Sequence, residues 1–470
     1  MSRYTFGLAI RAGLLAATCL TAAPAMAQEQ ASVEDRLERL ERLVEGLIGR
    51  LDAERGESLQ QTEAMAAQQS QLREESAALL AATRDLKDRQ NEIASQIATP
   101  KEQEDKGFRM GKTTVAYAGY VKVDAMTQRT SGGQLPATSI LRDFLVPAAI
   151  PVGGEASGFD TNFSARQSRF IFKTATDVGA QHTLNSHIEL DFLVTDGGDE
   201  RVSNSFIPRI RQGFITYDNW LIGQAWSTFM DVGALPDSVD FIGITPGTPF
   251  NRQPMVRWTK GGLQLAVEQP ETTVTTRLGG RIEAGDDVLP DFVAKYNLTG
   301  DWGRVSLAGI VRQLKISNDD FGSGDDSAMG YGLALSGKID LGARDDLRFS
   351  ASAGEGLGRY IGVNIVNDAA IGDNGDLDPI ATYAGFAALR HVWSEKLRSN
   401  VGAAYFKADN PVRFTTNQVS DESWNTFVNL IWSPVAPLDF GIELLYAERT
   451  LEDGRSGNLQ RMQFSTRYNF

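Results

Sequence analysis

The stretch RMQFSTRYNF at residues 461–470 has the two-residue period of a β-strand. Met462, Phe464, Tyr468 and Phe470 alternate with polar residues, so a strand here has one apolar and one polar face. In water, such an aromatic strand at a chain end would favour edge-to-edge aggregation. We therefore expect it to lie in a membrane, where lipid covers the apolar face and pairing with the first strand closes a barrel.

The same alternation recurs throughout the chain from Thr113 onward. In YVKVDAM (120–126) and LNSHIELDFLV (184–194), valines, leucines and isoleucines alternate with charged or polar residues. A chain-long pattern of this kind predicts sixteen antiparallel strands with apolar outer and polar inner faces. The expected strands are 113–126, 164–175, 182–195, 206–218, 219–228, 253–260, 263–269, 291–298, 303–316, 329–341, 346–356, 380–393, 397–408, 422–433, 437–449 and 458–470.

The connections between these strands fall into two alternating classes. Short ones such as YDNW, TKGG and WSEK interleave with long ones, among them 127–163, 229–252, 270–290 and 357–379. Outer-membrane barrels have an even number of strands, tight turns on the periplasmic side and long loops outside. A soluble β-sandwich is the alternative, but it gives no reason to sort its loops in this way.

The tryptophans provide a second test of the barrel. Five of the seven lie at or near the expected short turns, namely Trp220, Trp258, Trp302, Trp393 and Trp432. Amphipathic aromatic rings collect at membrane–water interfaces, so this clustering indicates one rim of a barrel.

The first hundred residues follow a different pattern. Residues 1–27 have the basic, apolar and small-residue regions of a secretory signal peptide, and they contain Cys19, the chain's one cysteine. Residues 28–107 are expected to form an α-helical coiled coil that oligomerises the chain, although a single exposed helix or a partly disordered tether remains the alternative. Its heptad positions begin with Val33, Leu37, Leu40, Val44, Leu47 and Leu51. Residues 108–470 form the expected barrel domain.

Composition excludes two classes of protein. A net charge of −14 speaks against nucleic-acid binding. Beyond residue 27 no apolar run reaches eighteen residues, which excludes a bundle of membrane helices.

Alternation also assigns charged residues to the inside of the barrel, where sixteen strands leave a water-filled channel. Arginine rings favour anions, and the guanidinium fork matches a carboxylate. Cross-strand ion pairs with inward acids could instead neutralise the arginines. The expected inward bases are Arg169, Lys173, Arg209, Arg211, Arg257, Arg312, Arg348, Arg398 and Arg467, and the inward acids are Asp124, Glu189, Asp191, Glu268 and Glu443.

The long connection at 229–252 is apolar and rich in proline and glycine. We expect it to fold into the barrel as a constriction, with Asp231, Asp237 and Asp240 opposite basic wall residues. Other long loops are acidic, as in TDGGDE and GDNGDLD, and could bridge lipopolysaccharide through calcium, although such loops usually only keep a surface solvated.

Several of these segments resemble one family. LIGQAWSTFMDVGALPDSVDF (221–241), FNRQPMVRWT (250–259), SRFIFKT (168–174) and HIELDF (187–192) are similar to the DcaP-like outer-membrane porins. The resemblance implies a sixteen-stranded homotrimer with an amino-terminal coiled coil that admits small anionic solutes such as dicarboxylic acids. It also implies that Arg209, Arg211, Arg252 and Arg257 could hold a carboxylate.

The expected function is therefore passive diffusion of small, preferentially anionic solutes through the bacterial outer membrane, with the coil in the periplasm. A general or sugar-selective porin is the alternative, ranked second because alternation places few aromatic residues inside. A barrel enzyme is not expected, because the three histidines, His182, His187 and His391, show no spacing typical of a catalytic triad. We expect no cofactor and no metal site.

Overall fold

A computed structural model describes residue 45 and residues 107–180, 182–194, 203–285, 287–317 and 326–470. The predicted signal peptide and, apart from residues 45 and 107, the predicted coiled coil lie outside the described residues. None of the described helices is both long and apolar enough to cross a membrane.

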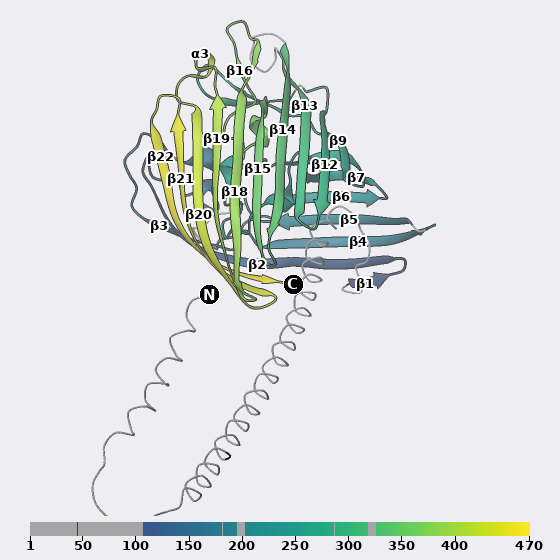
Figure 1. Ribbon diagram of the computed structural model, residues 1–470. Helices are drawn as coiled ribbons and strands as arrows, with labels where there is room; N and C mark the ends of the chain where they lie inside the picture. Colours follow the sequence, from purple (N-terminus) through teal and green to yellow (C-terminus); the bar gives the residue numbers. More distant parts are fainter. Residues whose placement is uncertain (1–44, 46–106, 181, 195–202, 286, 318–325) are drawn as a thin grey trace, which may run out of the picture. The chain divides into compact units, whose positions relative to one another are not determined.

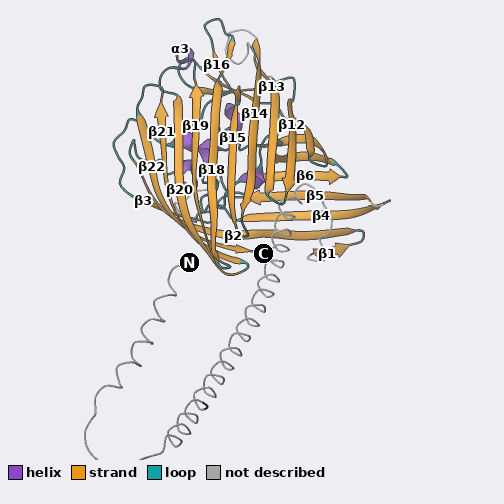
Figure 2. Ribbon diagram, viewed as in Figure 1, coloured by secondary structure: helices purple, strands orange, loops and turns teal. Residues whose placement is uncertain are grey.

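The described chain forms a closed antiparallel β-barrel (Figures 1 and 2). Its sixteen strands are β2 (Thr113–Thr130), β3 with β4 (Asp160–Ser164, Arg169–Gly179), β5 (His182–Asp191), β6 (Arg209–Tyr217), β7 (Trp220–Trp226), β8 (Arg252–Lys260), β9 (Leu263–Glu268), β12 (Asp291–Gly300), β13 (Gly303–Ile316), β14 (Asp326–Leu341), β15 (Asp345–Glu355), β18 (Ala381–Ser394), β19 (Leu397–Asp409), β20 (Ser420–Val435), β21 (Leu438–Leu451) and β22 (Ser456–Asn469).

β3 and β4 count as one barrel strand because they pair in succession with the same edge of β2. The short β1 (Gly107–Met110) adds a hairpin arm to β2. The predicted strand number and order are confirmed, and most predicted boundaries fall within a few residues of the observed ones.

The strands show the inverted polarity that alternation predicts. On β2, Val121 and Val123 are 45% and 47% exposed on the outer face, whereas Lys122 and Asp124 between them are 7% and 0% exposed inside the barrel. Such a surface is stable only when lipid surrounds it. At the short turns, Trp220, Trp302, Trp393 and Trp432 are exposed, as expected for an interfacial rim, and Trp258 is the register partner of Trp220.

Closure of the barrel depends on the pairing of β2 with β22, which runs from Tyr120↔Asn469 to Thr130↔Leu459. At its end, Phe470 N–H donates to Gly119 O at 3.0 Å and Gly119 N–H donates to Phe470 O at 3.2 Å. Gly119 has φ +152°, and a Cβ there would lie 2.1 Å from the carbonyl oxygen of Arg169. Only glycine fits where these three strand segments meet.

We therefore expect Gly119→Val to impair assembly of the barrel. The added side chain would push β4 away from β2, and overpacking of this kind costs about 1–3 kcal/mol before backbone strain is counted. The measurement is the folded fraction, read from the heat-dependent shift of the barrel band on detergent gels. Gly111→Val is the matched control, because nothing lies within 4 Å of a Cβ at Gly111 although its φ is also positive. Equal folded fractions for the two variants would contradict this account.

The long connections are more structured than the sequence predicted. β10 (Thr272–Thr275), β11 (Arg281–Ala284), β16 (Ala369–Ile371) and β17 (Leu377–Pro379) form a separate four-stranded sheet. Short helical turns occupy other connections: η1 (Ile140–Arg142), η2 (Pro147–Ala149), η3 (Val232–Ala234), η4 (Thr245–Gly247), η5 (Gly358–Tyr360) and α3 (Val412–Thr415).

Candidate functional site

The connection between β7 and β8, residues 227–251, lies inside the barrel, and we call it the inward loop. Its three acidic side chains form ion pairs with arginines of distant wall strands: Asp231 with Arg304 of β13, Asp237 with Arg398 of β19, and Asp240 with Arg461 of β22. The loop therefore reaches from its own strands to the opposite wall.

Backbone groups of the inward loop are also held by the wall. The Glu443 carboxylate accepts the N–H groups of Val239 at 2.8 Å and Asp240 at 3.2 Å. Lys122 Nζ donates to the carbonyl oxygen of Val239 at 2.8 Å. Buried charged groups bonded in this way fix a segment in one position.

The ion pairs of the inward loop leave its acids neutralised. Burial opposes ionisation of Asp237, but the charge and hydrogen bond of Arg398 outweigh it and lower the pKa of that carboxyl. Asp231 also accepts hydrogen bonds from Ser306 and Ser336. These acids do not present free negative charge to a solute.

Two buried apolar clusters join the loops to the wall from β9 to β22, and at β6 and β7 the loop contacts are Phe241 beside Arg211 and Phe250 beside Trp226. Phe229, Tyr360, Ile361, Ile365 and neighbouring residues form a buried cluster with wall residues of β9 to β19. Residues of the 135–150 and 234–244 regions form a second cluster with β18 to β22. Neither cluster includes a residue of β2 to β8, so within the described residues this part of the wall is not covered by the clusters.

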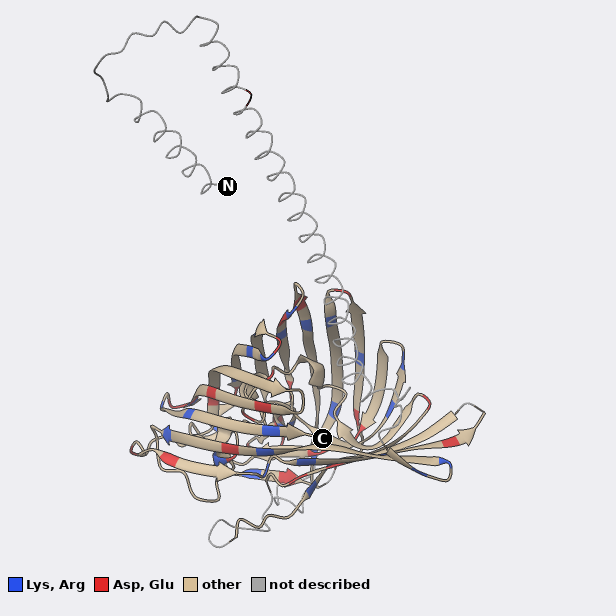
Figure 3. Ribbon diagram, turned by 90° about the horizontal axis from the view of Figure 1, so that it is seen from below, with Lys and Arg blue, Asp and Glu red and all other residues tan. Residues whose placement is uncertain are grey.

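A group of charged residues on β4, β5, β6 and β8 lies on this part of the wall, and we call it the charged wall. It consists of Arg169, Lys173, Glu189, Asp191, Arg209, Arg211 and Arg252. Figure 3 shows that basic and acidic positions are interspersed along the barrel strands. Five basic side chains thus face two carboxylates, an excess of three positive charges. Because the low-dielectric wall of a barrel focuses the field of its fixed charges, this excess favours a positive potential along the wall.

Ion pairs organise much of the charged wall. Arg209 Nε lies 2.7 Å from Asp191 Oδ1, and Arg211 Nη1 lies 2.7 Å from Asp191 Oδ2. Glu189 pairs with Arg211 and, at 3.2 Å, with Arg169 Nε. Arg209 and Arg211 lie together, but their carboxylate partners belong to the protein itself, and Arg211 is 1% exposed, so it adds charge to the wall without a free donor for a solute.

Arg252 differs from its neighbours because no carboxylate pairs with it among the described residues. Its guanidinium lies 4.8 Å from the ring centroid of Trp226, and its buried Nη1 has no hydrogen-bond partner in the part of the chain that the structure describes. Phe250 packs edge-on against Trp226 at 4.8 Å, and Phe241 lies 5.9 Å from Phe250. A cation with an unused donor therefore lies beside an aromatic cluster.

A model of the DcaP outer membrane protein family matches residues 56–470. The chain belongs to this family. The structure of the outer membrane channel DcaP of Acinetobacter baumannii is similar over 78% of this chain and 100% of that one, with 22% identity and a TM-score of 0.65. An anion-selective porin from Comamonas acidovorans matches 76% of this chain and 100% of its own length, at 10% identity and a TM-score of 0.48. No curated protein matches the chain.

This DcaP family member is thus an outer membrane protein with the barrel expected from its sequence. Its other predicted site residues lie apart from the charged wall. Arg257 on β8 is buried, and its Nη1 donates to the carbonyl oxygen of Trp226 at 3.5 Å. Arg348 bonds Asp346 and the carbonyl of Leu235 beneath the inward loop. Arg312 is 1% exposed, and its donors bond to protein groups. We therefore place Arg312 outside the solute-contacting set.

Two residues of the DcaP-family site escaped the sequence analysis. Arg304 and Arg461 anchor the inward loop, and the alternation Arg461–Gln463–Ser465–Arg467 could have placed Arg461 inside. The expectation of few inward aromatic residues stays a prediction for the channel lining. Phe386, Phe406 and Phe427 point inward from β18, β19 and β20, where they are buried beneath loop residues rather than exposed in a channel.

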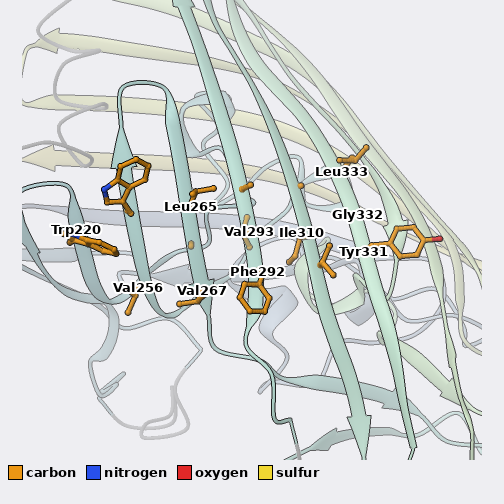
Figure 4. A pocket seen from close by; sticks show the side chains of 15 residues that line it. Trp220, Val256, Leu265, Val267, Phe292, Val293, Ile310, Tyr331, Gly332 and Leu333 are labelled. Carbon is orange, nitrogen blue, oxygen red and sulfur yellow. The ribbon is translucent and has the colours of Figure 1, made fainter.

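A concavity of about 860 Å³ on the outer face is separate from this site (Figure 4). Trp220, Val256, Leu265 and Phe292 line it, and all are exposed apolar residues of the lipid-facing surface. Among the described residues, no three His, Cys, Asp or Glu side chains are grouped so as to hold a metal ion.

Proposed function

We propose that this protein is an outer-membrane channel for passive diffusion of small hydrophilic solutes, preferentially anions such as dicarboxylic acids. The observation that carries the proposal is the excess of three positive charges on the charged wall, where five basic side chains face two carboxylates. In this proposal the solute passes between the inward loop and that wall.

Electrostatics account for the preference. An anion that leaves bulk water recovers part of its lost hydration through interaction with fixed positive charges, whereas a cation does not. The acids of the inward loop would oppose this preference if they were free, but each pairs with an arginine. The buried Nη1 of Arg252 has no partner among the described residues, and the planar guanidinium fork suits a carboxylate once the side chain turns toward the passage.

The assembly forms the remaining part of the proposal. The heptad pattern of residues 33–51 and the family resemblance support a homotrimer whose coiled coil lies in the periplasm. The exposed apolar barrel face is the surface that lipid and lipopolysaccharide would contact.

Planar-bilayer recording tests the channel and its preference together. We expect purified protein to give current steps in groups of three and, in a potassium chloride gradient, a reversal potential on the anion-selective side. The physical reason is the uncompensated charge of the wall. A reversal potential on the cation side would reject the preference, and a bilayer without steps would reject the channel.

A sugar-selective porin is the second candidate, and the aromatic cluster of Trp226, Phe241 and Phe250 favours it. Sugars stack on such rings, whereas dicarboxylates need the arginines. Block of the ion current by added solute separates the two. Stronger block by maltose or sucrose than by succinate would favour the sugar porin.

A further inference from the structure

The connection between β15 and β18, residues 356–380, also enters the barrel, and we call it the second loop. It is joined to the inward loop by an antiparallel bridge between Pro249 and Ile361. Phe250 N–H donates to Tyr360 O at 2.8 Å, and Gly362 N–H donates to Thr248 O at 2.9 Å. The two loops are thus hydrogen-bonded to each other inside the barrel, and we call the joined pair the partition.

Arg312 of β13 holds the second loop in place. Its Nη1 donates to Asp368 Oδ1 at 2.8 Å and to Gly356 O at 2.9 Å, and its Nε donates to Asp291 Oδ1 at 3.3 Å. Nη2 donates to the carbonyl oxygen of Glu271. The side chain of Arg312 and those of both aspartates are 0% exposed, so water does not compete for these bonds.

Asp368 joins the loop to Arg312 and is itself saturated. Its Oδ2 accepts the backbone N–H and the hydroxyl of Thr273, each at 2.9 Å. Its Oδ1 also accepts the N–H of Arg359 at 3.0 Å, at the start of η5. The Asp368 carboxylate therefore connects three elements: strand β13 of the wall, β10 of the four-stranded sheet, and η5, which precedes the bridge.

The network extends to the strand that carries Arg252. Tyr360 OH donates to Asp291 Oδ2 at 2.6 Å, and Gln253 Nε2 donates to Tyr360 OH at 2.7 Å. Arg359 Nη2 donates to Gln253 Oε1 at 2.8 Å. Gln253 lies next to Arg252 on β8, so the second loop borders the charged wall.

We propose that Arg312 and Asp368 are positioning residues that set the width of the solute passage without touching the solute. They hold the second loop, which the bridge joins to the inward loop, against β12 and β13 beside the charged wall. The proposal rests on the proposed function, because a passage must exist for its width to matter.

Asp368→Asn tests this positioning role by removing the charge that binds Arg312. We expect a higher single-channel conductance with larger current fluctuations, whereas the anion-to-cation permeability ratio stays at the wild-type value. A residue with a merely structural role would lower the folded fraction without raising conductance. Arg312→Lys, which keeps the charge but loses the fork, should raise conductance in the same way.

Asp373→Asn is the matched control. Asp373 lies in the same loop and pairs with Arg277 at 2.6 Å and with Arg413, but all three side chains are at least 40% exposed. Exposed pairs contribute little, so this variant should conduct like the wild type.

A disulfide across the Pro249–Ile361 bridge should restore the conductance that Asp368→Asn changes. Pro249 and Ile361 are a non-hydrogen-bonded pair, whose Cα atoms in an antiparallel ladder lie about 4.5 Å apart, within the range of roughly 4.4–6.8 Å that a disulfide spans. In the Asp368→Asn background, oxidised Pro249→Cys/Ile361→Cys should restore wild-type conductance, and reduction should remove the effect.

The outcomes separate this inference from the proposed function. A wild-type protein that conducts, with an Asp368→Asn variant of unchanged conductance, overturns the positioning role alone. A rise in conductance that the cross-link does not reverse also overturns it, because the partition would then not act as one body. A wild-type protein that forms no channel overturns the proposed function instead.

Discussion

Replacement of both Lys173 and Arg252 by glutamate is expected to change an anion-preferring channel into a cation-preferring one. The charged wall would then hold three basic and four acidic side chains, so its excess of three positive charges would become an excess of one negative charge. Neither residue belongs to an ion pair described above. The pairs of Arg169, Arg209 and Arg211 with Glu189 and Asp191 therefore remain.

The measurement is the reversal potential in a salt gradient, compared with that of a control of equal total charge. Lys260→Glu/Lys396→Glu changes the net charge by the same amount, but these exposed lysines lie at short turns on the rim, where salt screens them over about 10 Å at 0.1 M. We expect the control to keep the anion preference. An unchanged reversal potential in the Lys173/Arg252 variant, or an equal shift in the control, would mean that the wall does not set selectivity.

The wall strands could be predicted from the sequence because each strand has its own alternation of apolar and polar residues. Val121 and Val123 face lipid while Lys122 and Asp124 face inward, and the two-residue period records this directly. The same alternation places Glu189 and Asp191 on the inner face next to Arg209. Cross-strand ion pairs could therefore be predicted as an alternative to free arginines, and the structure contains the Arg209–Asp191 pair. Register between neighbouring strands follows from short turns, which makes contacts across them predictable.

The paths of the loops could not be predicted in this way. Asp237 and Arg398 are 161 residues apart, and no local pattern relates them. Asp240 was expected to oppose a basic residue, but only the folded loop selects Arg461 for it. Arg312 has the parity of a channel-lining residue, yet the second loop buries it. The two-residue alternation of a strand shows whether a side chain points into the barrel. It does not show which loop residues contact that side chain.

The largest loss of stability is expected from Arg461→Met. Arg461 is fully buried, and its Nη1 lies 3.0 Å from Asp240 Oδ2 while Nε and Nη2 donate to Gln128 Oε1 at 2.9 and 2.7 Å. Methionine fills similar space but leaves the Asp240 carboxylate without its cation. Removing one partner of a buried ion pair costs about 3–5 kcal/mol, because the remaining charge stays desolvated.

Urea unfolding in lipid vesicles, followed by tryptophan fluorescence, measures this loss. Arg455→Met on the same hairpin is the control, because Arg455 pairs with Asp453 at 2.7 Å in solvent, and it should leave the unfolding midpoint unchanged. The double variant Arg461→Met/Asp240→Asn removes the orphaned charge and should regain part of the loss. If Arg461→Met unfolds at the wild-type midpoint, the inward loop does not depend on this pair. The ion pairs of Asp231 and Asp237 and the bonds of Glu443 and Lys122 to the loop backbone would then hold it.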